Sequence, residues 1–427
     1  MKKRFAVWTL GLYAVYVLFM GLYLFWWADF GVPSDYQGSG ADPATFMTDR
    51  QLELSQEYSR YKQFLSFVGL PLEWMIYLGV LFFGVSKLFS NFSERVSRFS
   101  AVKIPVFVLL LSALTWFLTF PIHYINRWLS VKYGISTQSF SGWMRDDLIS
   151  FWINVGLTAV LMTVLYLLMK RATKRWWLYA WLLFVPYMAF MMYIQPVFID
   201  PLYNDFSPLS DPDLENKILT MAEQADIPAE RVYEVNMSEE TNAMNAYVNG
   251  IGSNLRIVLW DTTLNRLGEN EILFIMAHEI GHYVMHHLYF MLAGSIALGL
   301  VGLYLVYRLL HLSVRKWGTQ WGVTDVSDIA SLPALLLIFS LLSFAASPVE
   351  LAVSRGAEKD ADQYALEMTS DYDAAVGSFQ QLTVNGLSDV NPPALVKWLN
   401  YGHPTMMERI SMIEDYQQVD KKTSPDK

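Results

Sequence analysis

Seven long apolar stretches constrain the fold of this chain more than any other feature. They cover residues 5–27, 64–86, 104–122, 150–169, 176–199, 288–310 and 330–349. Each is close to the roughly 20 residues that an α-helix needs to cross a hydrocarbon core of about 30 Å. Backbone polar groups inside a bilayer must bond to one another, so such stretches form helices. The sequence therefore predicts an all-α multi-pass membrane protein.

Composition and the ends of the stretches agree with this prediction. Hydrophobic residues make up 53% of the chain and charged residues only 17%. Aromatic side chains gather at the ends of the stretches, as at bilayer interfaces: Trp26, Trp27, Tyr124, Trp128, Trp176 and Trp177. The first stretch could be a signal peptide, but it is too long and lacks a small-residue cleavage site. We expect an uncleaved first helix, and the short N-terminus is typical of a bacterial plasma-membrane protein.

The chain has no cysteine and a formal net charge of −9. The lack of cysteine excludes disulfides, thiolate zinc ligands and a cysteine nucleophile. The negative charge falls largely outside the apolar stretches, so a nucleic-acid partner is not expected. The lipid bilayer is the partner that the composition predicts.

Basic residues in the short loops predict an orientation. Fourteen lie on one side of the membrane: Lys2, Lys3, Arg4, Lys87, Arg95, Arg98, Lys103, Lys170, Arg171, Lys174, Arg175, Arg308, Arg315 and Lys316. The opposite loops carry six: Arg50, Arg60, Lys62, Arg127, Lys132 and Arg145. The positive-inside rule then places the N-terminus in the cytoplasm and residues 200–287 and 350–427 outside.

Two domains are expected. Residues 1–199 would form an N-terminal membrane domain with five helices, and residues 200–427 a second domain that includes the spans at 288–310 and 330–349. The largest polar insertion lies in the second domain and favours a helix at 211–226 and strands near 231–236 and 256–260.

The string His278-Glu279-Ile280-Gly281-His282 predicts a metal site in the second domain. Residues i and i+4 share one face of a helix, so both imidazoles can reach one zinc ion. Glu279 can then take a proton from the attacking water, as in metallopeptidases. The alternative is an ordinary surface helix. We expect this helix to begin near Glu269 and to continue unbroken into the sixth span, with His286 and His287 at the membrane interface.

A catalytic zinc needs a third protein ligand, and carboxylates and other histidines are the candidates. Glu358 is the best candidate because it lies about ten residues beyond Pro348, where the seventh span ends. Asp362 follows one turn later on the same helical face, where it could orient a ligand histidine. The E-x-x-x-D spacing alone is weak evidence for a metal site.

Several strings occur in an order that resembles a known family: Y-N-D-F-S-P-L at 203–209, N-A-Y-V-N-G at 245–250, R-I-V-L-W-D-T-T-L at 256–264, H-E-I-G-H, E-K-D-A-D at 358–362 and H-P-T-M-M-E-R at 403–409. Together they resemble the integral-membrane CAAX prenyl protease (a-factor-converting) family of zinc metalloendopeptidases, as a bacterial-type member. The resemblance covers nearly the whole chain. It implies seven helices that enclose a chamber, and a gluzincin-like peptidase domain with a small β-sheet.

The resemblance also implies roles for individual residues. One zinc ion per chain would be held by His278, His282 and Glu358, with Glu279 as the catalytic carboxylate and Asp362 as the partner of a ligand histidine. Asn245, Ala246 and Tyr247 would bind substrate along a strand. His403 and Arg409 would stabilise charge on the tetrahedral intermediate, although a loop histidine and a surface ion pair are the plain alternatives.

Two other functions compete. A protease that cuts within the bilayer also uses H-E-x-x-H, but such enzymes carry an L-D-G string that this chain lacks. A channel or transporter with structural zinc would need a fourth ligand and no Glu279. We expect hydrolysis of membrane-associated or C-terminal peptide segments at the membrane surface. The family cuts after a prenylated cysteine, a substrate not expected in bacteria. Its eukaryotic members face the cytosol, which conflicts with the charge count.

Overall fold

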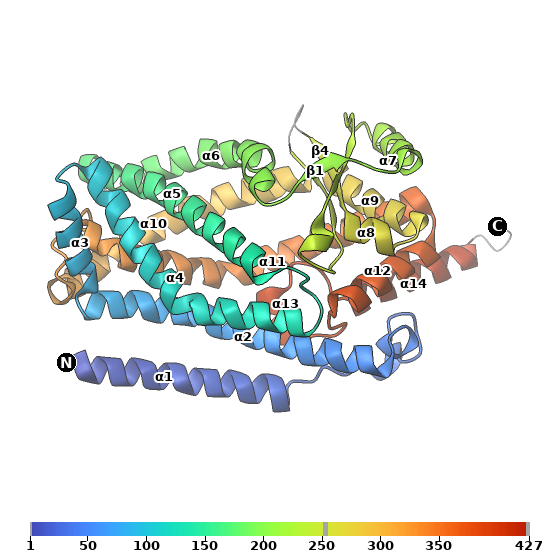
Figure 1. The fold of residues 1–427 in the computed structure, drawn as a ribbon, viewed down its shortest axis with the longest axis horizontal. Helices are drawn as coiled ribbons and strands as arrows, with labels where there is room; N and C mark the ends of the chain where they lie inside the picture. The colour runs from blue at the N-terminus through green and yellow to red at the C-terminus, as the bar shows by residue number, and fades with distance from the viewer. Residues whose placement is uncertain (1, 251–254, 424–427) are drawn as a thin grey trace.

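The computed structural model describes residues 2–250 and 255–423. Long helices run side by side through one part of the molecule, and a small sheet with shorter helices occupies the other (Figure 1). The N-terminus lies at the end of the helical part that is remote from the sheet. The chain is mostly helical with a small sheet, as predicted.

Seven helices are long and apolar enough to cross a membrane, which confirms the predicted spans. They are α1 (Lys2–Leu22), α2 (Asp49–Phe82), α4 (Ser100–Lys132), α5 (Phe140–Arg171), α6 (Trp176–Ile194), α10 (His287–Trp321) and α11 (Leu332–Thr369). A short helix, α3 (Val85–Val96), joins α2 to α4. α2 begins well before its apolar part because Thr48 and Gln51 form a capping box at its first turn.

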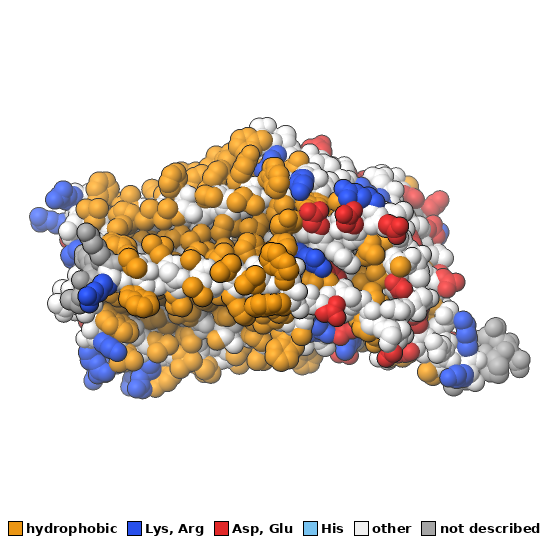
Figure 2. Space-filling view, turned by 90° about the horizontal axis from the view of Figure 1, so that it is seen from below, with side chains coloured by type: hydrophobic (Ala, Val, Ile, Leu, Met, Phe, Trp, Pro, Cys, Tyr) orange, Lys and Arg blue, Asp and Glu red, His pale blue; other side chains and the backbone are white. Residues whose placement is uncertain are grey.

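The surface of the helical part is apolar (Figure 2). Trp8, Leu12 and Phe117 expose 77%, 73% and 69% of their surface. An exposed band of this kind would be unfavourable in water and marks contact with lipid. Lys and Arg side chains gather at the left end of the band in Figure 2, remote from the sheet, and Asp and Glu side chains gather over the other end.

The sheet has four strands in the order β1-β2-β4-β3. These are β1 (Phe206–Pro208), β2 (Val232–Val235), β3 (Ala246–Asn249) and β4 (Arg256–Trp260), and only the β2–β4 pair is parallel. Ile257 and Leu259 of β4 are fully buried against α7 (Pro212–Gln224) and α9 (Glu269–Val284). The strands predicted near 231–236 and at 256–260 are confirmed. β3 forms one edge of the described sheet.

The expectation of one unbroken helix from Glu269 into the sixth span is wrong. α9 ends at Val284, and α10 begins at His287. Between them His286 adopts the left-handed conformation, with φ of 58° and ψ of 30°. A residue in this region cannot continue a right-handed helix, and histidine tolerates it better than a β-branched residue does. The peptidase motif and the sixth span are therefore separate elements joined by a tight turn.

α11, in contrast, continues from the seventh span to Thr369 without interruption. It packs along α9, and Ala365 and Leu366 near its end share a buried cluster with Phe274 and Ala277 of α9. The close approach depends on Gly281 in the peptidase motif, because a Cβ atom there would lie 3.1–3.3 Å from three atoms of Tyr364. Helices α12 (Tyr372–Gly386), α13 (Ala394–Asn400) and α14 (Met406–Thr423) follow. Of these, α12 packs on α9, and both α13 and α14 contact α11.

Candidate active site

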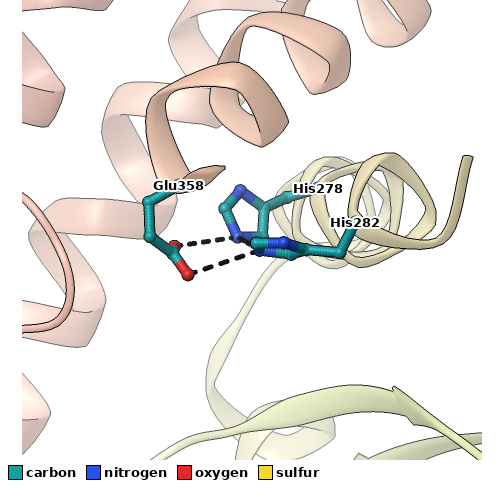
Figure 3. Close-up of side chains that lie close together, drawn as sticks. All are labelled: His278, His282 and Glu358. Carbon is teal, nitrogen blue, oxygen red and sulfur yellow. Dashed lines mark hydrogen bonds and ion pairs between the residues drawn. The ribbon is translucent and has the colours of Figure 1, made fainter. Parts of the chain in front are cut away.

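Three side chains from two helices meet at one point (Figure 3). His278 and His282 lie one turn apart on α9, and Glu358 lies on α11. The Nε2 atoms of the two histidines are 3.1 Å apart. Glu358 Oε2 lies 3.3 Å from His278 Nε2, and Glu358 Oε1 lies 3.4 Å from His282 Nε2. The structure thus brings the three candidate ligands together.

This trio fits a metal ion such as zinc by distance and by chemistry. Zinc bound tetrahedrally at about 2.0–2.1 Å places its ligand atoms roughly 3.3–3.4 Å from one another. The three measured separations are 3.1, 3.3 and 3.4 Å. Glu358 Oε2 is buried and has no hydrogen-bond partner among the described residues. A cation would compensate this oxygen, which is otherwise costly to bury.

Asp362 contacts one member of the trio, His278, and Arg409 in turn binds Asp362. Asp362 is fully buried, and its Oδ1 lies 2.8 Å from Nδ1 of His278. Arg409 donates from Nε to Asp362 Oδ2 at 2.8 Å and from Nη2 to Oδ1 at 2.5 Å. The guanidinium group lies over the ring of Phe379, with 4.0 Å to the ring centroid. Two donor groups of Arg409 are therefore committed to Asp362.

Neighbouring charges and burial shift the pKa values of His278 and Glu279. Burial alone would lower the pKa of the His278 imidazole, but the neighbouring carboxylates of Asp362 and Glu358 raise that pKa to about 9. A metal ion therefore has to compete with a proton for this ring. Burial raises the pKa of Glu279, although charge on the two histidines opposes the shift. A raised pKa is typical of carboxylates that act as general base and then as general acid.

A cavity of about 350 Å³ opens onto this network. Its walls include His278, Glu279, His403 and Arg409. Glu279 directly follows the candidate ligand His278 in the chain and contributes to the cavity wall rather than to the trio of candidate ligand atoms. A carboxylate in this position can reach a water molecule that enters the cavity.

Part of the segment predicted to bind substrate, residues 245–247, lines the same cavity. Asn245 and Ala246 line it, whereas Tyr247 is not among the lining residues. The backbone of Asn245 is held by Thr263, whose Oγ1 accepts from Asn245 N at 2.9 Å and donates to Asn245 O at 2.8 Å. The start of β3 is thus fixed next to the cavity. In the described sheet β3 is an edge strand, so an extended peptide could pair with it.

His403 lies in the loop between α13 and α14. Its side chain is 63% exposed, and its Nε2 is 3.3 Å from Oε1 of Glu358. The same loop is anchored by Arg355, which donates to the carbonyl of Tyr401 at 2.6 Å. His403 thus reaches the trio from the cavity side, which agrees with its predicted place near the reacting groups.

One further contact, between His282 and His287, lies outside the predicted site. Their Nδ1 atoms lie 2.9 Å apart, whereas the sequence favours a place at the membrane interface for His287 over binding of the metal. Residues five apart on a continuous helix point about 140° away from each other. The turn at His286 brings the two rings together. Residues 282–290 contain no glycine or proline that would predict a turn there.

Comparisons with known proteins cover nearly the whole chain. The model of peptidase family M48 matches residues 208–417, and the model of the CAAX prenyl protease N-terminal region, with five membrane helices, matches residues 37–205. The uncharacterized metalloprotease YhfN of Bacillus subtilis is 48% identical over 97% of both chains. CAAX prenyl protease 1 of Saccharomyces cerevisiae is 26% identical over 86% of both, and the Arabidopsis thaliana homolog is 27% identical over 88% of this chain and 90% of its own.

The fold also has a counterpart among solved structures. The crystal structure of S. mikatae Ste24p superposes with a TM-score of 0.77 at 21% identity, over 96% of this chain and 98% of that one. The competing functions, a channel or transporter and a protease that cuts within the bilayer, are not favoured by these matches. The chain belongs to peptidase family M48, as a multi-pass membrane metalloprotease of the CAAX prenyl protease type.

Proposed function

We propose that this chain is a zinc endopeptidase that hydrolyses membrane-associated or C-terminal peptide segments at the membrane surface, with one zinc ion per chain. The observation that carries the proposal is the separation of the three ligand atoms by 3.1–3.4 Å beside a cavity lined by Glu279. His278, His282 and Glu358 would hold the ion. When bound, zinc supplies a Lewis acid that polarises the scissile carbonyl and acidifies water.

Glu279 is the proposed general base and acid. Its carboxylate takes a proton from the attacking water and then delivers it to the departing amine nitrogen. The raised pKa of Glu279 supports both transfers, because the group then holds the proton more firmly between them. No covalent intermediate with the protein is required.

Three further polar residues, Asp362, Arg409 and His403, would orient a ligand or stabilise charge that develops during the reaction. Asp362 orients His278 and keeps its Nδ1 protonated, which leaves Nε2 free for the ion. Arg409 acts mainly through Asp362, since two of its donor groups are committed to that carboxylate. His403, which is exposed at the cavity, is the better candidate to stabilise the developing oxyanion.

The substrate would bind as an extended strand. β3 is an edge strand of the described sheet and begins at the cavity wall, so backbone hydrogen bonds to it would align a peptide beside Glu279. Asn245 and Ala246 lie where such a peptide would run, and Tyr247 would contact it farther along the strand. Several relatives are named CAAX prenyl proteases, whereas the Bacillus relative is named only as a metalloprotease. We therefore propose a peptide substrate without requiring a prenyl group.

The domain division is also a proposal. Residues 1–199 would form the membrane domain and residues 200–427 the peptidase domain, which contributes α10 and α11 to the helical part. A chamber enclosed by the seven helices remains a prediction.

The experiment that tests the function is Glu279→Gln in the purified full-length chain. The variant should bind as much zinc as the unmodified protein but lose peptide cleavage by about 10²- to 10⁴-fold. Metal content is measured by mass spectrometry and cleavage with a quenched fluorescent peptide library. Glu269→Gln is the matched control, because Glu269 lies on the same helix and pairs with Lys217 at the surface. Nearly full activity of Glu279→Gln would refute the assignment of the base.

A further inference from the structure

His282 has a hydrogen-bond partner that the peptidase motif does not contain. Its Nδ1 lies 2.9 Å from Nδ1 of His287, and the two rings meet edge to face with their centroids 5.0 Å apart. His287 is buried, with 9% of its surface exposed. His278, the other candidate ligand of α9, has Asp362 in the equivalent position. Each histidine of the motif therefore has its own partner at Nδ1.

The backbone between the motif and the sixth span creates this contact. α9 ends at Val284, His286 takes the left-handed conformation, and α10 starts with His287. The turn is closed by the amide of His286, which donates to the carbonyl of Tyr283 at 3.0 Å. Left-handed residues other than glycine are uncommon and persist where the surrounding structure requires them. Here the turn folds the first residue of α10 back over His282.

Hydrogen-bond chemistry then fixes the roles of the four ring nitrogens. His282 Nε2 belongs to the ligand trio, at 3.1 Å from His278 Nε2 and 3.4 Å from Glu358 Oε1. A neutral imidazole that offers Nε2 to a metal carries its proton on Nδ1 and needs an acceptor there. The Nδ1 of a neutral His287 is such an acceptor when its own proton is on Nε2.

We propose that His287 is a positioning residue: its Nδ1 accepts the Nδ1–H of His282 and holds that ring in the tautomer and orientation that present Nε2 to the metal. This inference rests on the proposed metal site. The two ligand histidines would then differ in their hydrogen-bond acceptor at Nδ1, which is a carboxylate for His278 and a neutral imidazole for His282. His287 would thus couple the first turn of the sixth span to the metal centre.

The test compares metal binding by variants of the full-length protein. His287→Leu and His287→Ala remove the acceptor, whereas His287→Asn keeps an acceptor oxygen close to the place of Nδ1. His286→Asn is the matched control, because asparagine also tolerates the left-handed conformation. Affinities for Zn²⁺ and Co²⁺ are measured by competition with a chelator, and the visible spectrum of the Co²⁺-loaded protein reports ligand geometry. Circular dichroism identifies which variants fold.

We expect the folded Leu or Ala variant to bind Zn²⁺ about 10- to 100-fold more weakly and to show an altered Co²⁺ spectrum. His287→Asn should recover most of the affinity, and His286→Asn should match the unmodified protein. Unchanged affinity and spectrum in a folded Leu or Ala variant, or no recovery in folded His287→Asn, would overturn the proposal. If the unmodified protein itself binds no metal, the proposed function fails, which is a different result.

Discussion

Nδ1 of His278 lies 2.8 Å from Oδ1 of Asp362, a carboxylate with no exposed surface. The same carboxylate receives two hydrogen bonds from the buried guanidinium of Arg409. One acidic side chain therefore serves both a candidate metal ligand and a buried cation. Its removal should affect metal binding and stability together.

The first prediction concerns Asp362→Asn. The variant should bind zinc about 10- to 100-fold more weakly, because the acceptor that orients His278 loses its charge. It should also unfold more easily, since a buried cation without its partner costs about 3–5 kcal/mol. Chelator competition and thermal unfolding measure the two effects. Asp360→Asn, an exposed carboxylate on the same helix, should change neither. Equal behaviour of the two variants would contradict the role of Asp362.

The second prediction concerns the third ligand. Glu358→Ala should reduce bound zinc towards zero, because two imidazoles alone hold the ion weakly. Glu367→Ala, which removes an exposed carboxylate from the same helix, should leave the metal content unchanged. Full occupancy in Glu358→Ala would instead point to His403, whose Nε2 lies 3.3 Å from Glu358 Oε1.

The third prediction is a pH dependence of metal binding. Without the ion, the carboxylates of Asp362 and Glu358 outweigh the effect of burial and raise the pKa of His278 to about 9. A metal ion needs the neutral ring, so a proton must leave at any pH below that value. The apparent affinity should therefore rise with pH by up to about tenfold per unit between pH 7 and 9 and then level off. In Asp362→Asn the rise should end at lower pH. An affinity that is flat from pH 7 to 9 would exclude a protonated His278.

The fourth prediction concerns the approach of α9 to α11. Gly281→Ala places a methyl group 3.1–3.3 Å from Tyr364 and should destabilise the protein by about 1–3 kcal/mol. Gly356→Ala is a strict control on α11, because a Cβ there meets nothing within 4 Å. Alanine is the better helix former, so that control should be neutral or stabilised by up to about 1 kcal/mol. Unfolding in detergent measures both variants. Equal stability would show that the glycine is not needed for packing.

The fifth prediction is the orientation in the membrane. Fourteen basic residues in the loops on one side against six on the other predict that the peptidase domain faces outward. Because the chain has no cysteine, Thr173→Cys and Ser210→Cys can be labelled in intact cells with an impermeant thiol reagent. Both residues are exposed, Thr173 between α5 and α6 and Ser210 just before α7. Labelling should occur at position 210 and not at 173, and the reverse pattern would invert the orientation.

Hydropathy predicted the membrane helices well, because long apolar stretches have few alternatives in a bilayer. The strand at Arg256–Trp260 was equally clear, since β-branched and aromatic residues are concentrated there. The turn at His286 was not predictable, because histidine in the left-handed conformation depends on tertiary contacts and carries no local signature. The pairing of Arg409 with Asp362 could not be read from spacing either, since the two residues are distant in the chain and meet only when α14 packs on α11.

One continuous helix, α11, contains both the last membrane span and the candidate ligand Glu358. A helix advances by about 1.5 Å per residue, so the number of residues between the span and Glu358 sets the height of the candidate metal site above the end of the span. If the proposed substrate is anchored in the bilayer, its scissile bond would have to lie at that height. The number of residues between anchor and bond would then select substrates as strongly as their chemical identity. A single residue inserted into α11 between the span and Glu358 would shift this setting and turn the carboxylate away by about 100°.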